Sequence, residues 1–124
     1  MNSEQVDIPC GWGKISVQIF GDTKTLNAKP IIALHGFLDN SNSFKPIAPY
    51  ITQNEPFYLI AVDLPGMGFS SHIPEGIPYS TKFYLMCVRR IVMHFELEKF
   101  IFLTHSFGCS IALAVIIRIN YQDS

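Results

Sequence analysis

The feature that most constrains this fold is an apolar run at residues 100–109, which passes through T-H-S-F-G at residues 104–108 into a second apolar stretch. The pattern predicts a buried strand, a sharp turn and a helix. Small residues are needed in such a turn because the strand and helix backbones pass close together. Ser106 at its centre would expose its Oγ, and the first helical amides would point at whatever oxygen the serine attacks. The pattern is typical of a nucleophile elbow.

Ser106 has two interpretations, a catalytic nucleophile or an ordinary serine that caps the helix. A nucleophile elbow requires a left-handed backbone with φ near about +60°, which is uncommon for a residue other than glycine. We therefore expect a positive φ at Ser106 if the elbow is real. A serine inside a regular helix would contradict it.

Two further segments upstream read as strands that end in turns. The segment 31–40 begins with an apolar run that leads into a turn at His35-Gly36. The segment 57–70 begins with another apolar run, which leads into D-L-P-G-M-G-F-S. Runs that are apolar on both faces are typical of strands in a parallel sheet covered on both sides.

These three motifs, in this order, resemble the α/β-hydrolase superfamily, and residues 35–44 look most like its serine hydrolase-like proteins. The resemblance spans about residues 6–119. It implies an α/β fold of three layers, with a mostly parallel sheet and flanking helices. A domain of this superfamily has about eight strands and well over roughly 200 residues, whereas this chain has 124. The resemblance thus implies that residues 1–124 are the N-terminal part of a single α/β-hydrolase domain, truncated after the nucleophile-elbow helix.

The resemblance implies a serine hydrolase that cleaves an ester, thioester or amide bond of a small-molecule acyl substrate through an acyl-enzyme on Ser106. The backbone amides of Phe37 and Phe107 would form the oxyanion hole. The catalytic histidine and acid would follow residue 124, so the chain alone is expected to be inactive. No metal or organic cofactor is implied. The alternative is a non-catalytic hydrolase-like protein or truncated isoform that acts by binding.

The resemblance also assigns supporting roles around the serine. His35 and Gly36 are expected to shape the oxyanion loop, and Gly108 to allow close packing after the serine. His105 occupies the variable position of the elbow and is expected to point away from the site. Thr104 stands where the G-x-S-x-G pattern has its first glycine, and a β-branched residue at that crowded position could cost about 1–3 kcal/mol of strain.

Asp63 precedes a Pro-Gly turn, so we expect it to accept backbone amides and brace that loop rather than serve as a catalytic acid. Gly66 and Gly68 could suggest a phosphate loop. The chain has neither G-K-[ST] nor G-x-G-x-x-G, which argues against a nucleotide site.

Composition narrows the function classes further. A net charge of −1, with one adjacent basic pair at residues 89–90, gives no electrostatic signature of nucleic-acid binding. The polar first residues show no secretory signal. The three cysteines, Cys10, Cys87 and Cys109, lack C-x-x-C spacing, which argues against a disulfide framework or a zinc site. These observations favour a reducing, cytoplasmic setting; the oligomeric state and the substrate's identity are not encoded in any pattern here.

A membrane span is the competing interpretation of residues 100–117. This stretch of 18 residues has no Asp, Glu, Lys or Arg, which is the lower edge of a membrane-spanning length. Thr104, His105, Ser106 and Ser110 interrupt its apolarity at mid-depth. The pattern therefore favours a buried strand followed by a buried helix.

The remaining elements are predicted from periodicity and turn residues. We expect an antiparallel, half-exposed strand over residues 15–19 paired with one at 6–8, a turn at 27–30 and a short helix over 43–51. A helix should follow Ser80 as N-cap and pack on the sheet through residues at helical spacing, Tyr84, Val88, Ile91, Val92 and Phe95. A strand at 99–104 should lead into a helix over 106–119, and the resemblance implies that this strand lies between the one at 31–34 and one that follows residue 124.

Overall fold

The structure is a computed structural model that describes residues 1–53 and 56–122, and its strands form one five-stranded sheet in the order β1-β2-β4-β3-β5. In chain order the elements are β1 (Glu4–Cys10), β2 (Gly13–Phe20), β3 (Lys29–Leu34), the 3₁₀ helix η1 (Ser41–Phe44), α1 (Ala48–Thr52), β4 (Phe57–Val62), α2 (Thr81–His94), β5 (Ile101–Thr104) and α3 (Phe107–Gln122). The neighbours β4, β3 and β5 run parallel, whereas β1–β2 and β2–β4 are antiparallel.

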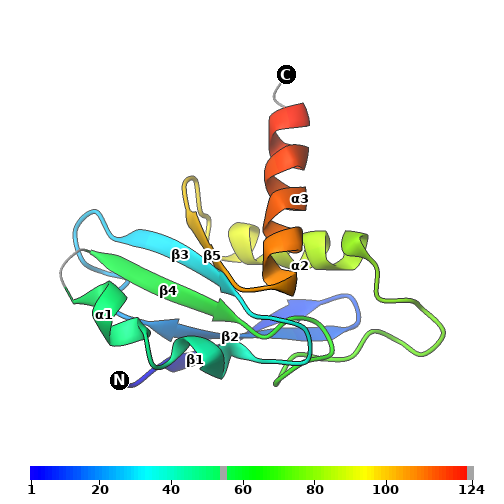
Figure 1. Cartoon of the computed structure of the whole chain (residues 1–124), viewed down its shortest axis with the longest axis horizontal. Coiled ribbons are helices and arrows are strands. Elements are labelled where there is room, and N and C mark those ends of the chain that lie inside the picture. The colour runs from blue at the N-terminus through cyan, green and yellow to red at the C-terminus, as the bar shows by residue number, and fades with distance from the viewer. Residues whose placement is uncertain (54–55, 123–124) are drawn as a thin grey trace.

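Helices cover both faces of this sheet, with α2 and α3 on one face and α1 on the other (Figure 1). Because successive strand residues point to opposite faces, β3 contributes to two apolar clusters. Ile32 and Leu34 pack in the larger cluster with α2 and α3, and Ile31 and Ala33 pack in the smaller one with α1 and η1. The predicted α/β architecture of three layers is confirmed.

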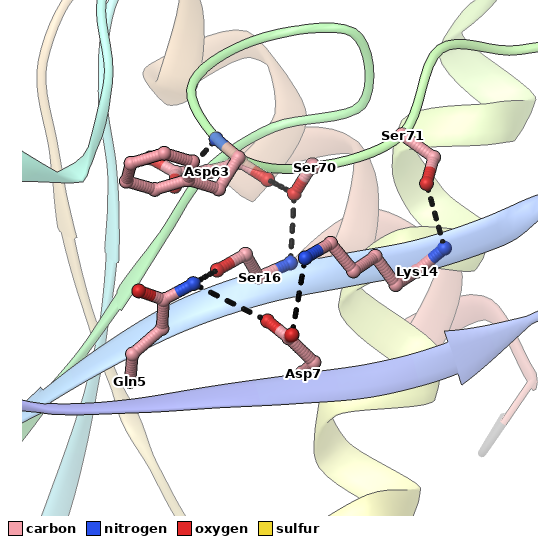
Figure 2. A network of polar contacts seen from close by, with 8 residues as sticks. Gln5, Asp7, Lys14, Ser16, Asp63, Ser70 and Ser71 are labelled. Atoms are coloured by element: carbon pink, nitrogen blue, oxygen red, sulfur yellow. Dashed lines mark hydrogen bonds and ion pairs between the residues drawn. The ribbon is translucent and has the colours of Figure 1, made fainter.

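The N-terminal hairpin has the predicted strands and antiparallel pairing, with Val6 opposite Val17 and Ile8 opposite Ile15. The expectation that its second strand is half-exposed is wrong, because Ser16 is only 1% exposed. Gln5 donates to the Ser16 hydroxyl, and the Ser16 amide donates to Ser70 Oγ at 2.8 Å (Figure 2). A loop distant in sequence thus covers the polar side of β2.

The single helix predicted over residues 43–51 is instead two short elements, η1 and α1, with Pro46 between them. A proline lacks the amide that a continuous helix needs at that point. Pro49 sits in the first turn of α1, where a missing amide costs nothing. The turn expected at 27–30 is shorter, because Pro30 already belongs to β3.

Helix α2 begins after Ser80 as predicted, and Tyr84, Cys87, Val88 and Ile91 form its buried face. The Ser80 side chain makes no capping hydrogen bond. Its backbone carbonyl accepts instead from the amides of Phe83 and Tyr84 at 3.0 and 3.4 Å. The position of the cap is therefore confirmed, and the expected side-chain contact is not made.

Strand β5 pairs with β3 as predicted, with Ile31 opposite Ile101 and Leu34 opposite Thr104. Within the described residues it is the last strand on its side of the sheet. Helix α3 follows at once and its C-terminal half projects away from the sheet (Figure 1). Over residues 1–53 and 56–122, no helix combines the length and apolarity that crossing a membrane requires.

Candidate functional site

The turn between β5 and α3 has the geometry expected of the elbow. Ser106 has φ 54°, in the left-handed region, and its side chain lies at the surface. The His105 amide donates to the Leu34 carbonyl at 3.1 Å, which extends the β3–β5 pairing by one residue. The Cys109 amide then donates to the Ser106 carbonyl at 2.9 Å, which begins the helix. The predicted φ near +60° is found.

Gly108 is required by the approach of α3 to the end of β3. A Cβ at this position would collide with the carbonyl oxygen of Leu34 and lie 2.9 Å from the Leu34 Cβ. Because the obstacle is backbone, no side-chain rotation would relieve it. The glycine of the S-x-G pattern therefore lets the helix start directly beside the strand.

Thr104 fits at the position where a glycine was the expected residue. Its Oγ1 lies 3.0 Å from Cys109 Sγ in the first turn of α3. The φ angle of Thr104 is not positive. The side chain thus has a polar contact in the crowded turn.

The loop after β3, which we call the His-Gly loop (residues 35–39), lies against the elbow. A Cβ at Gly36 would be 3.5 Å from Ser106 Cβ and 3.3 Å from His105 Nδ1. The His105 ring therefore rests beside Gly36, and His105 is not among the residues that line the cleft described below. The rings of Phe37 and Phe107 also meet, edge to face, with centroids 5.9 Å apart.

The two amides proposed as oxyanion donors belong to residues next to the contact between the His-Gly loop and the elbow: Phe107 follows Ser106, and Phe37 follows Gly36, which lies against the serine. Over the described residues, neither amide donates a hydrogen bond to another part of the chain. Phe107 is the first residue of α3, where helical amides have no acceptor within the helix. Both N–H groups are thus free to bind an oxygen.

His35 is fully buried and holds the His-Gly loop to the end of β4. The Leu64 amide donates to its Nε2 at 3.0 Å, and its Nδ1 lies 2.6 Å from the Gly36 carbonyl oxygen. Because Nε2 accepts, the ring carries its proton on Nδ1 and donates it to that carbonyl. Both nitrogens are engaged, so His35 positions the loop and has no nitrogen left to act as a base.

Asp63 fixes the turn after β4. Its carboxylate, 2% exposed, accepts from the Ser41 amide at 2.7 Å and from the Phe69 amide at 3.1 Å. Gly68, at φ 54°, lies so close that a Cβ would collide with this carboxylate. Ser70 donates to the Asp63 carbonyl oxygen (Figure 2). The carboxylate thus organises the loop over residues 63–71, as its place before the Pro-Gly turn predicts.

No described side chain forms a hydrogen bond with Ser106 Oγ. Within the described residues, the serine therefore has no base in contact with it. His72 instead lies 3.3 Å from the Tyr79 hydroxyl, and the His94 ring packs on Phe95.

Burial, and to a smaller extent Cys10, raises the pKa of the Cys87 thiol, which is therefore protonated at neutral pH. Among the described residues, no three potential ligands cluster as a metal site would require.

A cleft of about 620 Å³ opens beside the two phenylalanines. Its walls come from the His-Gly loop, the loop after β4 and the first turns of α2 and α3. They consist of Phe37, Leu38, Pro65, Gly66, Met67, His72, Tyr79, Thr81, Tyr84, Phe107, Ser110 and Ile111. Sequence reasoning missed this cleft, because Tyr79 lies in an aperiodic loop and Tyr84 shows only the spacing of a core residue.

The sequence matches the family model described as alpha/beta hydrolase fold over residues 29–120. It is 35% identical over 105 residues to a serine hydrolase-like protein of Danio rerio, covering 85% of this chain and 31% of that protein. A human serine hydrolase-like protein is 38% identical over 97 residues, covering 78% of this chain and 45% of the other. The chain therefore spans less than half the length of these curated relatives.

Solved structures show the same arrangement. A hypothetical protein from Pseudomonas aeruginosa superposes with a TM-score of 0.80 at 31% identity, over 93% of this chain and 38% of the other. A thioesterase domain from the curacin biosynthetic pathway reaches 0.83 at 22% identity, over 93% and 41% of the two chains, and shares the fold. With a family match that covers most of its length and a common architecture, this chain belongs to the α/β-hydrolase fold family.

Proposed function

We propose that this chain is the N-terminal part of a serine hydrolase in which Ser106 is the nucleophile. The observation that supports this most is the left-handed backbone of the exposed Ser106, together with the unpaired amides of Phe37 and Phe107 in the adjacent segments. A left-handed backbone at a non-glycine residue costs about 1–3 kcal/mol, and such residues cluster at active sites, where the surrounding structure holds them in place. A capping serine has an extended backbone instead, as Ser80 does with φ −116° and ψ 162°.

In the proposed reaction, Ser106 Oγ attacks the carbonyl carbon of an ester, thioester or amide, and its proton passes to a histidine that acts as base. The carbonyl oxygen gains the negative charge and binds the amides of Phe37 and Phe107. Collapse of this intermediate expels the leaving group, which takes the proton from the histidine. Water then hydrolyses the acyl-Ser106 bond by the same steps in reverse. Each oxyanion donor would contribute about 3–4 kcal/mol to transition-state stabilisation.

The histidine and the acid of this mechanism are proposed to come from residues after 124. Two observations support that assignment: Ser106 Oγ has no partner among the described side chains, and the relatives are more than twice as long as the matched region. His35 is excluded as the base because both its nitrogens are engaged. Residues 1–124 would then be one part of a single domain.

The proposed substrate is a small-molecule acyl compound, and the reaction as written needs no metal or organic cofactor. The three cysteines are free thiols in the structure. Free thiols are typical of a reducing compartment, which supports our proposal of a cytoplasmic setting.

One observation favours a second candidate, a non-catalytic hydrolase-like protein that acts by binding. Thr104 and Cys109 occupy the elbow side by side, where the usual motif has a glycine facing the helix. If these side chains hold the turn away from its reactive geometry, Ser106 would be a structural remnant. The cleft could then still bind a ligand.

Ester hydrolysis tests the proposal in a chain that begins with these 124 residues and continues to the length of the relatives. Ser106→Ala should lower kcat/KM for a p-nitrophenyl ester by about 10³-fold or more, because the nucleophile is lost while binding remains. Ser80→Ala, at a serine whose side chain makes no capping hydrogen bond and does not line the cleft, serves as the matched control. Equal activity of the Ser106→Ala variant would refute the assignment. A folded protein that binds esters but never turns them over would support the second candidate.

A further inference from the structure

We propose that the cleft beside Ser106 is the pocket for an unbranched aliphatic acyl chain, and that Tyr79 limits how far this chain extends. The inference rests on the proposed role of Ser106, because that role fixes where the acyl carbonyl lies. It adds the chemical class of the acyl group and the residue that selects its length.

A continuous row of aromatic rings leads from the serine along the cleft. Phe37 packs on Phe107 with centroids 5.9 Å apart, Phe107 on Tyr84 at 5.1 Å, and Tyr84 on Tyr79 at 6.4 Å. All four residues line the cleft. The first two carry the amides proposed to hold the carbonyl oxygen. A chain that leaves the carbonyl along this row would contact apolar surface throughout.

The chemistry of the walls suits a ligand without charge. The lining includes no Asp, Glu, Lys or Arg, and its bulk comes from aromatic residues with Leu38, Met67 and Ile111. Burial raises the pKa of the Tyr84 phenol, which therefore stays neutral at physiological pH. A charged or sugar-like acyl group would lose its hydration in this cleft without gaining partners.

The polar atoms of Tyr79 and its neighbours are already engaged with each other. The Ile73 amide donates to the Tyr79 hydroxyl at 3.0 Å, and His72 Nδ1 lies 3.3 Å from the same oxygen. Tyr79 thus presents its ring, rather than a free hydroxyl, to a ligand. The other hydroxyl groups of the lining belong to Tyr84, whose phenol is neutral, and to Thr81 and Ser110, which lie in the first turns of helices and are exposed.

Gly66 fixes the place of the Tyr79 ring. Its φ is +78°, and a Cβ there would lie 2.5 Å from the Tyr79 hydroxyl oxygen. The glycine therefore lets Tyr79 lean across the loop after β4, and the bond from Ile73 holds it there. Because Tyr79 is the last ring of the row, it is the residue placed to stop a growing chain.

The first experiment measures binding without turnover. The protein, extended to the length of its relatives and carrying Ser106→Ala, is titrated calorimetrically with straight-chain carboxylates from acetate to decanoate. Each added CH₂ that enters the cleft should tighten Kd by roughly fourfold, since burying one is worth about 0.8 kcal/mol. The gain in affinity should stop once the carboxylate reaches a definite number of carbons. An affinity that does not change with chain length would overturn the inference.

Substitutions in the protein then locate the bound acyl chain. Tyr79→Ala should move the stopping point to longer carboxylates, whereas Tyr79→Phe, which keeps the ring, should leave it in place. Ser110→Phe, which fills the cleft from α3, should weaken octanoate binding by roughly tenfold or more. Met93→Phe adds a ring at an exposed position of α2 outside the cleft and should change Kd less than about twofold. If Ser110→Phe and Met93→Phe have equal effects in well-folded proteins, the acyl chain binds elsewhere.

The outcomes separate this inference from the proposed function. If the carboxylates bind with the expected length dependence but the unsubstituted protein hydrolyses no ester, the pocket assignment stands and the catalytic proposal falls. If Ser106-dependent hydrolysis occurs with no preference among acetyl to decanoyl esters, the catalytic proposal stands and the acyl pocket is wrong.

Discussion

Strands β3 and β5 lie side by side and have similarly apolar sequences, yet their surroundings differ. The last four residues of β3 are all buried, whereas those of β5 are exposed or half-buried, with Ile101 at 49% exposure. Strand β3 has a neighbour on each side, while β5 has one within the described residues. The burial of these two strands is therefore set by their neighbouring strands more than by their amino-acid composition.

The same contrast extends to the elements around the two strands. The inner region, which we define as β2, β4, β3 and the loops after β3 and β4, is cross-linked by buried polar groups such as His35 and Asp63. The outer edge, defined as β5 and α3, leaves Leu113 and Ile117 59% and 63% exposed. The strands of the inner region therefore have neighbours on both sides, and the outer edge has apolar surface that a further element could cover.

The largest effect should come from the inner region, at Asp63. Asp63→Ala would leave the amides of Ser41 and Phe69 without their acceptor, at about 1–3 kcal/mol for each buried donor. We expect the free energy of unfolding in urea to fall by about 2–5 kcal/mol. Asp39→Ala, at a half-buried carboxylate in the neighbouring loop, is the control and should cost far less. Equal losses would mean that Asp63 does not brace the inner region.

The next effect is expected where the two regions meet. Gly108→Ala should destabilise the chain by about 1–3 kcal/mol, because the added methyl meets the backbone of Leu34. Gly11→Ala is the matched control, since a Cβ there meets nothing within 4 Å. Thermal unfolding of both variants checks this. A harmless Gly108→Ala would show that α3 does not press on β3 as closely as described.

A smaller effect on folding is expected at the outer edge. Leu113→Lys should change the stability of the 124-residue chain by less than about 0.5 kcal/mol, because the side chain is already exposed. Ile111→Lys, buried in the same helix, should be strongly destabilising. In the longer chain, we expect Leu113→Lys to become costly as well. If it stays neutral there, nothing covers this face.

The exposed edge also predicts how the 124-residue chain behaves alone. A free strand edge beside an apolar helix favours self-association. Sedimentation velocity should therefore show species larger than a monomer, and Leu113→Lys combined with Ile117→Lys should reduce them. A monodisperse monomer with a cooperative thermal transition would mean that the outer edge needs no cover.

The smallest effect concerns the pKa of Asp39 in the His-Gly loop. The hydrogen bond from the Ser43 hydroxyl, at 2.5 Å, and then the Asn40 amide lower this pKa below 3.8. The carboxylate therefore contributes stability above pH 3.8, which is lost as pH falls through the lowered pKa. Ser43→Ala should move the pKa back towards 3.8 in an NMR titration, and Ser110→Ala should not. An unchanged value would show that the loop contact is not formed in solution.

The sequence predicted the elements whose pattern is local. Alternation over residues 15–19 and helical spacing from Tyr84 to Ile91 depend on nearest neighbours in the chain, and both elements form. The positive φ at Ser106 also follows from a local motif, because the strand, turn and helix around an S-x-G triplet are typical of an elbow with that backbone.

Features that depend on distant segments were not predicted. The burial of Ser16 comes from Ser70, and the place of the His105 ring comes from Gly36, contacts that no periodicity encodes. The aromatic row from Phe37 to Tyr79 joins four parts of the chain. Each ring alone is typical of a core or loop residue. Their common cleft exists only once the sheet has brought the loops together.

Covalent labelling of Ser106 by a fluorophosphonate, followed by mass spectrometry of the modified peptide, tests the central claim most directly. In the chain extended to the relatives' length, the adduct should lie on Ser106 and disappear with Ser106→Ala. The 124-residue chain should label barely at all, because the base that activates the serine is proposed to follow residue 124. Robust, Ser106-dependent labelling of the short chain, or an adduct on another residue of the long one, would contradict the account.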